Sequence, residues 1–432
     1  MKTNASIYDL NGCPPFGKAF PVGMQHMLAL MVGNVTPIIL IAATLGFDNF
    51  QVSFLIQCSL LVAGVVTVFQ LYSFGIVGSK LPIMMGTSFT YLAIAISIGG
   101  KFGMSGIIGA VLIGAIFQIL LGFCITRIKK FFPPLVTGCV VLCLGLTLIP
   151  VGIKYFAGGV DSANYGSLNN LLVGSVTLFT IVFLQFFTKG ITNIAAILIG
   201  ICGGYILAVC LGMVNFAAVA NAAWFSFPKP LSYGVSFQLE AIIPMAIICL
   251  ITSVQSIGNL SAVAFSGLKR EVTGKELRGG LLAEGLGSAF CALFNAIPTT
   301  SYAQNVGIVS ITKAVNRFSL LLGALFLVLC GFVPKLAALF VAMPPAVLGG
   351  AAILLFSTVA VTGMQMIGSE RGFDNRTTII AALSIGLGAG FFFCPDIFAA
   401  YPEWIAILLT SGLPLATVVA FVLNIVIKPK EK

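Results

Sequence analysis

Blocks of about twenty consecutive apolar residues recur from one end of the chain to the other, and they set the fold class. A block of this length can cross the hydrocarbon core of a bilayer as a helix. Strands of an outer-membrane barrel instead alternate polar and apolar residues, so the blocks exclude that architecture. Of the 432 residues 59% are hydrophobic and 8% are charged, whereas a soluble domain carries about 25% charge. This composition excludes a soluble enzyme, a nucleic-acid-binding domain and a disordered chain. The chain is predicted to be an all-α polytopic membrane protein.

Fourteen transmembrane segments are predicted, and we number them spans 1 to 14 in chain order. An even number of spans places both ends of the chain on the same side of the membrane. The approximate ranges are 20–45, 52–76, 81–99, 104–126, 133–152, 168–188, 191–213, 241–265, 277–294, 299–313, 318–333, 343–363, 377–395 and 404–427.

The Lys and Arg residues support this topology and orient it. Eighteen of the 22 lie in the two tails and in the loops that follow even-numbered spans. Loops rich in Lys and Arg stay in the cytoplasm. We therefore expect a multi-pass protein of the cell (inner) membrane, with cytoplasmic tails at residues 1–19 and 428–432. Residues 1–19 are too polar for a cleaved signal peptide. The opposite side of the membrane holds only Lys101, Lys154, Lys229 and Lys335.

Three short motifs occur in the same order in both halves of the chain, at offsets of 225, 213 and 211 residues. These matches define two repeats of seven spans. Because seven is odd, the second repeat must lie inverted in the membrane, and inverted repeats place a substrate site near the membrane midplane. The pairs are Gly33-Asn34 with Gly258-Asn259, Thr87-Ser88-Phe89 with Thr300-Ser301-Tyr302, and the segment from Pro133-Pro134 with that from Pro344-Pro345.

Spans 3 and 10 are the expected broken elements of the two repeats. Both are short, and span 10 opens with Pro298 followed by Thr, Thr, Ser and Tyr, which favours extended backbone. Irregular backbone at membrane depth is tolerated where it is buried in protein or lines a cavity. We therefore expect short extended segments in both spans. The alternative is two ordinary helices with Ser and Thr at packing positions.

Ionisable residues inside the membrane are costly and mark candidate functional positions. Glu284 is the only one of the 12 acidic residues in the middle of a span, where a carboxylate needs a partner or a proton. The single histidine, His26, follows Gln25 in span 1, and a structural imidazole is favoured over a functional one there. Amides in spans 8 and 10 complete the polar set, although amides in bundles often only bond neighbouring helices. They are Gln255, Asn259, Gln304 and Asn305.

The run from Gln304 to Lys313 resembles the signature of the nucleobase–ascorbate transporter family. That signature is Gln, Glu or Pro, then Asn-x-Gly, four residues, and Thr followed by Arg, Lys or Gly. Here it stands as Gln304-Asn305-Val306-Gly307, four residues, and Thr312-Lys313. The Gln25-His26 pair and the Gly279–Gly285 stretch also resemble this family.

The resemblance implies a fold of 14 transmembrane segments in a 7+7 inverted repeat with two domains. Spans 1–4 and 8–11 would form a core domain from residues 20–126 and 241–333. Spans 5–7 and 12–14 would form a gate domain from residues 133–213 and 343–427. It also implies a homodimer that forms through the gate domains.

The family's substrate contacts are carried over to spans 1, 3, 8 and 10. In span 10 they fall on Gln304 and the backbone of Tyr302 and Ala303. In span 3 they fall on the backbone around Ser88 and Phe89. Span 8 would contribute Gln255 and Asn259, and span 1 a wall near Gly33. A coupling and structural network would comprise Glu284, His26, Asn305 and Gln25.

Span 8 departs from the family pattern in a way that bears on coupling. The family normally has Glu where this chain has Gln255, and purine carriers often have Asp where it has Asn259. Neither amide can titrate, so Glu284 is the remaining buried carboxylate that could carry a proton. Gln304 itself resembles carriers of purines such as xanthine or urate, whereas uracil carriers usually have Glu at that position.

We therefore expect a secondary active transporter that imports a nucleobase, with a purine favoured. Proton symport would proceed by alternating access between the core and gate domains. The alternatives are a uniporter or sodium-coupled carrier of a nucleobase, uracil included, and an anion carrier of the related 7+7 fold. An enzyme is not expected, since one His and one buried Glu on different spans provide neither a nucleophile–base pair nor a metal cluster. No cofactor or metal is expected either.

Overall fold

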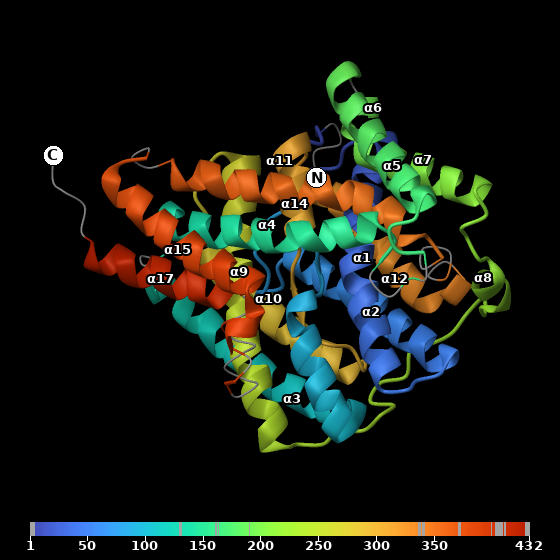
Figure 1. Ribbon diagram of the computed structural model, residues 1–432, viewed down its shortest axis with the longest axis horizontal. Coiled ribbons are helices and arrows are strands. Elements are labelled where there is room, and N and C mark those ends of the chain that lie inside the picture. The colour runs from blue at the N-terminus through green and yellow to red at the C-terminus, as the bar shows by residue number, and fades with distance from the viewer. Residues whose placement is uncertain are drawn as a thin grey trace.

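The chain is almost entirely helical in a computed structural model (Figure 1). It describes residues 5–128, 132–159, 162, 164–189, 191–335, 338, 342–369, 373–398, 400–401, 409 and 412–427. The first repeat contains α1 (Phe16–Thr44), α2 (Asn49–Leu71), β1 (Met85–Thr87), η1 (Phe89–Tyr91), α3 (Leu92–Ile128), α4 (Pro134–Phe156), α5 (Leu168–Phe187), α6 (Ile191–Ile194) and α7 (Ala196–Cys210). The short α8 (Ala217–Asn221) connects it to the second repeat. That repeat contains α9 (Leu239–Leu268), α10 (Gly274–Leu293), β2 (Thr299–Ser301), α11 (Ala303–Thr312), α12 (Arg317–Phe332), α14 (Pro345–Ile367), α15 (Asn375–Phe393), η3 (Pro395–Phe398) and α17 (Leu413–Val426).

Seven of the described helices are long and apolar enough to cross a membrane, or eight if the bent α1 counts as one span. Span 9 is the 20-residue helix α10, which carries more polar residues, and spans 7, 11 and 14 contain shorter apolar helices. Span 3 consists of β1, η1 and the start of α3, and α3 continues into span 4 after a break at Gly103, whose backbone is not helical (φ 66°, ψ −170°). Span 10 consists of β2 and α11. Helix α17 is the end of span 14, most of whose first part, like the tail at 428–432, lies outside the described residues.

The extended segments predicted in spans 3 and 10 are confirmed. Strands β1 and β2 pair antiparallel with Met85 opposite Ser301, Gly86 opposite Thr300 and Thr87 opposite Thr299. Both strands are fully buried, so protein covers the irregular backbone as membrane depth requires. The alternative of two uninterrupted helices is wrong.

Helices α4 and α14, which begin the matched Pro-Pro segments, lie side by side (Figure 1). Each begins with a proline at its first helical position, where the missing N–H costs nothing. Their backbones approach closely because glycines face the contact. A Cβ atom on Gly145 would lie 2.4 Å from Ala360 N, and one on Gly363 would lie 2.4 Å from Leu142 N.

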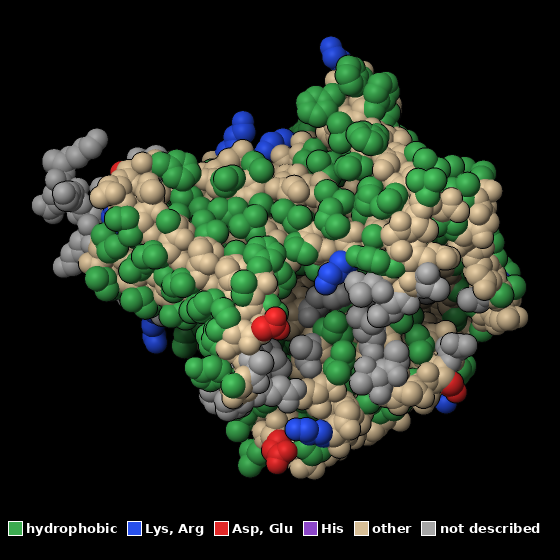
Figure 2. Space-filling view, in the orientation of Figure 1, with side chains coloured by type: hydrophobic (Ala, Val, Ile, Leu, Met, Phe, Trp, Pro, Cys, Tyr) green, Lys and Arg blue, Asp and Glu red, His purple; other side chains and the backbone are tan. Residues whose placement is uncertain are grey.

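Most helices contact others of the same predicted domain. Contacts join the core helices α1, α2, α3, α9, α10 and α12, and they join the gate helices α4, α5, α7, α14, α15 and α17, whereas α11 of the predicted core packs against α14 as well as against α9. The division into a core and a gate domain, and the movement of one against the other, stay predictions. Hydrophobic side chains cover the face that α4, α14 and α15 present in Figure 2. Such a surface suits a lipid environment.

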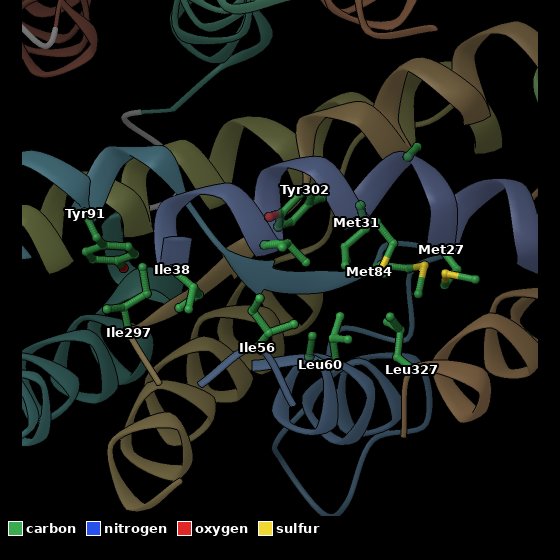
Figure 3. Packing of buried hydrophobic residues seen from close by; sticks show 14 of the residues in the cluster. Met27, Met31, Ile38, Ile56, Leu60, Met84, Tyr91, Ile297, Tyr302 and Leu327 are labelled. Atoms are coloured by element: carbon green, nitrogen blue, oxygen red, sulfur yellow. The ribbon is translucent and has the colours of Figure 1, made fainter. Parts of the chain in front are cut away.

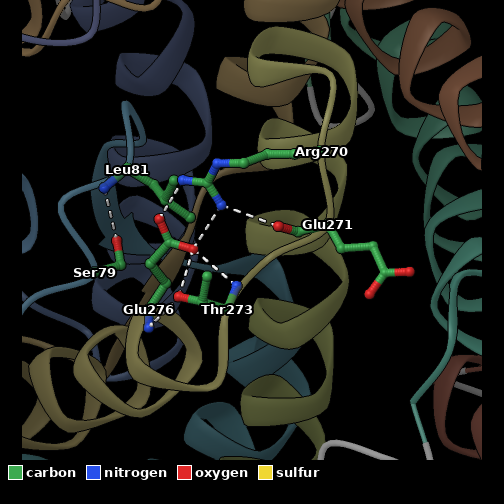
Figure 4. A network of polar contacts seen from close by, with 6 residues as sticks. All are labelled: Ser79, Leu81, Arg270, Glu271, Thr273 and Glu276. Atoms are coloured by element: carbon green, nitrogen blue, oxygen red, sulfur yellow. Dashed lines mark hydrogen bonds and ion pairs between the residues drawn. The ribbon is translucent and has the colours of Figure 1, made fainter.

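The connection between α9 and α10 is fixed by charged and polar groups (Figure 4). Thr273 and Glu276 form a capping box at the start of α10. Arg270 Nη2 lies 2.6 Å from Glu276 Oε1, and Arg270 Nη1 donates to Glu271 O at 2.9 Å. This turn holds the first residues of the helix that carries Glu284.

The predicted N-terminal tail is partly built into the fold. Helix α1 begins at Phe16, and Ile7 is buried against Val22 and Ala314. Ile7 O accepts hydrogen bonds from Val315 N and Asn316 N, both at 3.1 Å. Residues 5–15 therefore cover the loop between α11 and α12.

Candidate functional site

A cavity of about 300 Å³ lies where the two repeats and the two predicted domains meet. Its size suits a small ligand. None of the described residues that line it carries a charged side chain, and both hydroxyl and amide groups face it. From the core helices and strands it is lined by Gly33, Ser88, Thr90, Ile248, Gln255, Thr300, Ser301, Tyr302, Ala303 and Gln304. From the gate helices it is lined by Leu144, Thr147, Leu148, Val151, Phe392 and Leu413.

The N-terminus of α11 faces this cavity. The helix begins at Ala303 directly after β2, and no side chain caps it. The first N–H groups of such a helix have no intrahelical acceptor, and the helix dipole makes this end electropositive. Because Tyr302, Ala303 and Gln304 all line the cavity, a carbonyl or other electron-rich ligand atom is favoured here.

The opposite element, η1, is capped by its own chain. Ser88 Oγ accepts from Thr90 N at 3.2 Å and donates to Thr90 Oγ1 at 3.0 Å. Ser88 lines the cavity, and contact of the backbone around it with a substrate stays a prediction. The side chain of Phe89 lies outside the described residues.

Gln255 and Gln304 bring two amides to the cavity from α9 and α11. Gln255 is 5% exposed, and its Oε1 accepts from Thr90 Oγ1 at 3.2 Å, which leaves its NH₂ group to donate elsewhere. Gln304 is 8% exposed, and its side chain forms no hydrogen bond with any described residue. A buried polar group without a partner is costly. A ligand that pairs with both amides would remove this cost.

Gly33 was expected to form a wall of the ligand site, and its contact with a ligand stays a prediction. It lines the cavity, but a Cβ atom on it would first meet Tyr302, with both Cε1 and the hydroxyl oxygen 2.9 Å away. The Tyr302 hydroxyl donates to Thr87 O. Figure 3 shows Tyr302 in one packed layer with Met31 and Met84. Gly33 therefore makes room for the ring that joins β2 to β1.

Asn259 does not line the cavity. It is fully buried, and its Nδ2 donates to Ser301 O at 2.8 Å and to Ser301 Oγ at 3.1 Å. Its structural place is behind β2. Substrate contact by Asn259 is therefore not supported by the geometry.

Glu284 also lies outside the cavity lining, in a fully buried polar cluster. Gln118 Nε2 donates to Glu284 Oε1 at 3.1 Å. Tyr91 and Thr252 belong to the same cluster, with their hydroxyl oxygens 2.5 Å apart. The sequence analysis missed Gln118, Tyr91 and Thr252. The available signal was Gln118 itself, a lone amide in the middle of the apolar span 4.

His26 holds Asn305 from behind α11. His26 Nδ1 lies 2.8 Å from Asn305 Nδ2, which also donates to His26 O at 3.2 Å. The amide must donate, so Nδ1 accepts and the ring proton is assigned to Nε2. This contact supports the structural interpretation of His26. The buried side chain of Gln25 has no hydrogen-bond partner among the described residues.

The described residues contain no group of three or more His, Cys, Asp or Glu that could hold a metal ion.

Comparison with known proteins identifies the family. Residues 17–397 match the model of the Permease family of the Xan_ur_permease type. The chain is 35% identical to the xanthine permease of Bacillus subtilis, over 95% of this chain and 94% of that one. It is also 35% identical to the uric acid permease PucJ of the same organism, over 96% and 94% of the two chains.

A solved structure shares the fold. The transmembrane domain of a cyanobacterium bicarbonate transporter, BicA, superimposes with a TM-score of 0.52 at 14% identity, over 95% of this chain and 100% of that one. The 14-span arrangement in a 7+7 inverted repeat is thereby confirmed. So is the resemblance carried by the residues from Gln304 to Lys313: this multi-pass membrane protein belongs to the permease family.

Proposed function

We propose that the protein is a secondary active transporter that imports a purine such as xanthine or urate. The observation that carries this proposal is the pair of amides, Gln255 and Gln304, beside the uncapped N-terminus of α11 in one cavity whose described lining is uncharged. Gln304 offers one acceptor and two donors. An oxidised purine edge presents carbonyl and N–H groups side by side, which matches this set. The names of the relatives, a xanthine permease and a uric acid permease, agree with it.

The proposed transport cycle is alternating access with a proton as coupling ion. Purine contacts would come from Gln255, Gln304, Ser88 and the backbone at Tyr302 and Ala303. Glu284, the buried carboxylate nearest these elements, would bind and release the proton. The protein would stand in the inner membrane with both termini in the cytoplasm and would dimerise through its gate helices. It would release the purine chemically unchanged.

A nucleobase uniporter and a sodium-coupled carrier are the alternatives that the coupling experiment separates. The anion-carrier alternative rests on fold likeness alone, and 14% identity to a bicarbonate transporter domain carries no activity.

The test is an uptake panel in cells that lack their own purine carriers. Radiolabelled xanthine would enter cells that produce the protein, unlabelled urate or guanine would compete, and a protonophore would abolish accumulation. Chromatography of the cell contents would recover xanthine unchanged. Uptake that is insensitive to the protonophore but requires sodium would identify sodium, and not the proton, as the coupling ion. Absence of uptake for every purine and for uracil would contradict the proposed function.

A further inference from the structure

Gln118 occupies the centre of the buried polar cluster that contains Glu284. Its Nε2 lies 3.1 Å from Glu284 Oε1, 3.2 Å from the Tyr91 hydroxyl, 3.2 Å from Thr252 Oγ1 and 3.3 Å from Cys249 O. These partners come from α10, η1 and α9, whereas Gln118 itself belongs to α3. One amide therefore joins four segments of the predicted core domain.

The hydrogens of this cluster can be assigned by counting. Thr252 donates its hydroxyl hydrogen to Cys249 O at 2.9 Å. The Tyr91 hydroxyl, 2.5 Å from Thr252 Oγ1, must then donate to Thr252. The two N–H groups of Gln118 are then shared among Glu284 Oε1, the Tyr91 oxygen, Thr252 Oγ1 and Cys249 O. Gln118 Oε1 and Glu284 Oε2 are buried and have no hydrogen-bond partner among the described residues.

We propose that Gln118 is a positioning residue that links proton binding at Glu284 to the substrate cavity. When Glu284 is ionised, its oxygen accepts from the Gln118 amide. When a proton binds to Glu284, the new O–H group needs an acceptor, and the unpartnered Gln118 Oε1 provides one after a half-turn of the amide. The proton is transferred to the carboxylate, and no other covalent bond changes.

This half-turn would act on Gln255 by two short routes. It removes the N–H donor from Tyr91, which follows Thr90 in η1, and Thr90 donates to Gln255 Oε1. It also frees Thr252, which lies one helical turn before Gln255 on α9. The position of the Gln255 amide, which lines the cavity, would thereby depend on whether Glu284 is protonated.

Few other titratable groups face Glu284. Within the described part of the chain they are the Tyr91 hydroxyl from η1 and the Cys249 thiol from α9. No Lys, Arg or His of that part interacts with its carboxyl group. The hydroxyl groups of Ser256, Thr252 and Thr300 also lie near this carboxyl group, but they do not titrate. Glu284 therefore carries the change of charge in this region.

This inference rests on the proposed purine transport, and its test separates the two. Gln118→Met keeps the side-chain length but removes both donor and acceptor. The matched control is Gln57→Met, which changes another buried amide, on α2, whose Nε2 donates to Gly331 O and to no other described residue. Xanthine binding is measured over a range of external pH, together with exchange between loaded sides and accumulation driven by a proton gradient.

We expect Gln118→Met to bind and exchange xanthine, with a binding affinity that no longer depends on pH and with accumulation lost. Gln57→Met should behave like the wild type. A Gln118→Met protein that keeps the wild-type pH dependence and accumulation overturns the inference. So does one that is present and folded but binds no xanthine at any pH, because Gln118 would then act on the ligand directly.

If Gln118→Met does not reach the membrane, Gln118→Asn replaces it, since the shorter amide cannot reach both Glu284 and Tyr91. Wild-type pH dependence with accumulation, or loss of xanthine binding at every pH, would overturn the inference for this variant too. A wild-type protein that binds neither xanthine nor another purine contradicts the proposed function instead, whatever the variants do.

Discussion

Asn34 and Asn259 lie 225 residues apart in the chain, and each holds the strand of its own repeat. Asn34 Oδ1 accepts a hydrogen bond from Thr87 N at 2.8 Å, and Asn259 Nδ2 donates one to Ser301 O at 2.8 Å. Asn34 thus uses the acceptor oxygen of its side chain, whereas Asn259 uses the donor NH₂ group. Together they fix the buried β1–β2 pair between α1 and α9, and this pair positions the half-helix α11 at the cavity.

This relationship predicts that Asn259→Ala weakens the fold more than the site. Removing the amide leaves the Ser301 carbonyl unpaired in the interior, which costs about 1–3 kcal/mol of stability. Thermal unfolding of the purified protein should show a lower midpoint, with xanthine affinity nearly unchanged. The control is Ser261→Ala, whose hydroxyl bonds only Ile257 O of its own helix. Unchanged stability with lost affinity would show that Asn259 contacts the ligand after all.

The two cavity amides should govern affinity. Gln304→Ala and Gln255→Ala each leave polar groups of a bound purine unpaired, at a cost of about 1–3 kcal/mol, so affinity should fall by about fivefold to a hundredfold. Competition binding with radiolabelled xanthine measures this. Gln238→Ala, an exposed amide at the start of α9, should leave the affinity unchanged. Wild-type affinity in both cavity variants, at normal protein levels, rules the assignment out.

Ala303 should be the point where the backbone passes closest to the ligand. A larger side chain at this buried position, between β2 and the rest of α11, would occupy the space in front of the free N–H groups. Ala303→Leu should therefore lose xanthine binding while it keeps its unfolding temperature. If the variant transports normally, the start of α11 is not where the purine binds.

Gly33 should be intolerant of a methyl group because of Tyr302. The added Cβ would stand 2.9 Å from the Tyr302 hydroxyl and 3.2 Å from Gln304 Nε2, and the displaced ring would lose its contact with Thr87. We expect Gly33→Ala to lower both stability and affinity. Gly100→Ala, where nothing lies within 4 Å, should match the wild type in both measurements. Equal behaviour of the two variants would contradict this explanation.

The sequence predicted the features that repeat along it. Apolar blocks indicate spans, matched motifs indicate the inverted repeat, and the run after Pro298 indicates extended backbone. Each of these signals lies within a short stretch of sequence, so it can be interpreted without knowing how the helices pack.

Contacts between distant segments could not be predicted in this way. Gln255 and Asn259 are four residues apart and share a helix face, but one helical turn, about 5.4 Å, separates their depths. That step places Gln255 at the cavity and Asn259 behind β2. Gln118 lies in an apolar block with no periodic polar pattern, and its importance depends on the meeting of α3, η1, α9 and α10. A family motif predicts which type of residue stands at a position. Which side chains that residue contacts is decided by the packing of the helices, which the motif does not contain.

Proton-coupled purine import is the central claim, and one measurement tests it most directly. Purified wild-type protein and Glu284→Gln are reconstituted in liposomes with an imposed proton gradient, and the accumulation of radiolabelled xanthine is followed with and without a protonophore. Glu284→Gln permanently mimics the protonated acid. The account predicts that the wild type concentrates xanthine until the protonophore is added, whereas Glu284→Gln only exchanges it between loaded sides. Gradient-driven accumulation by Glu284→Gln that still collapses with the protonophore would contradict the account.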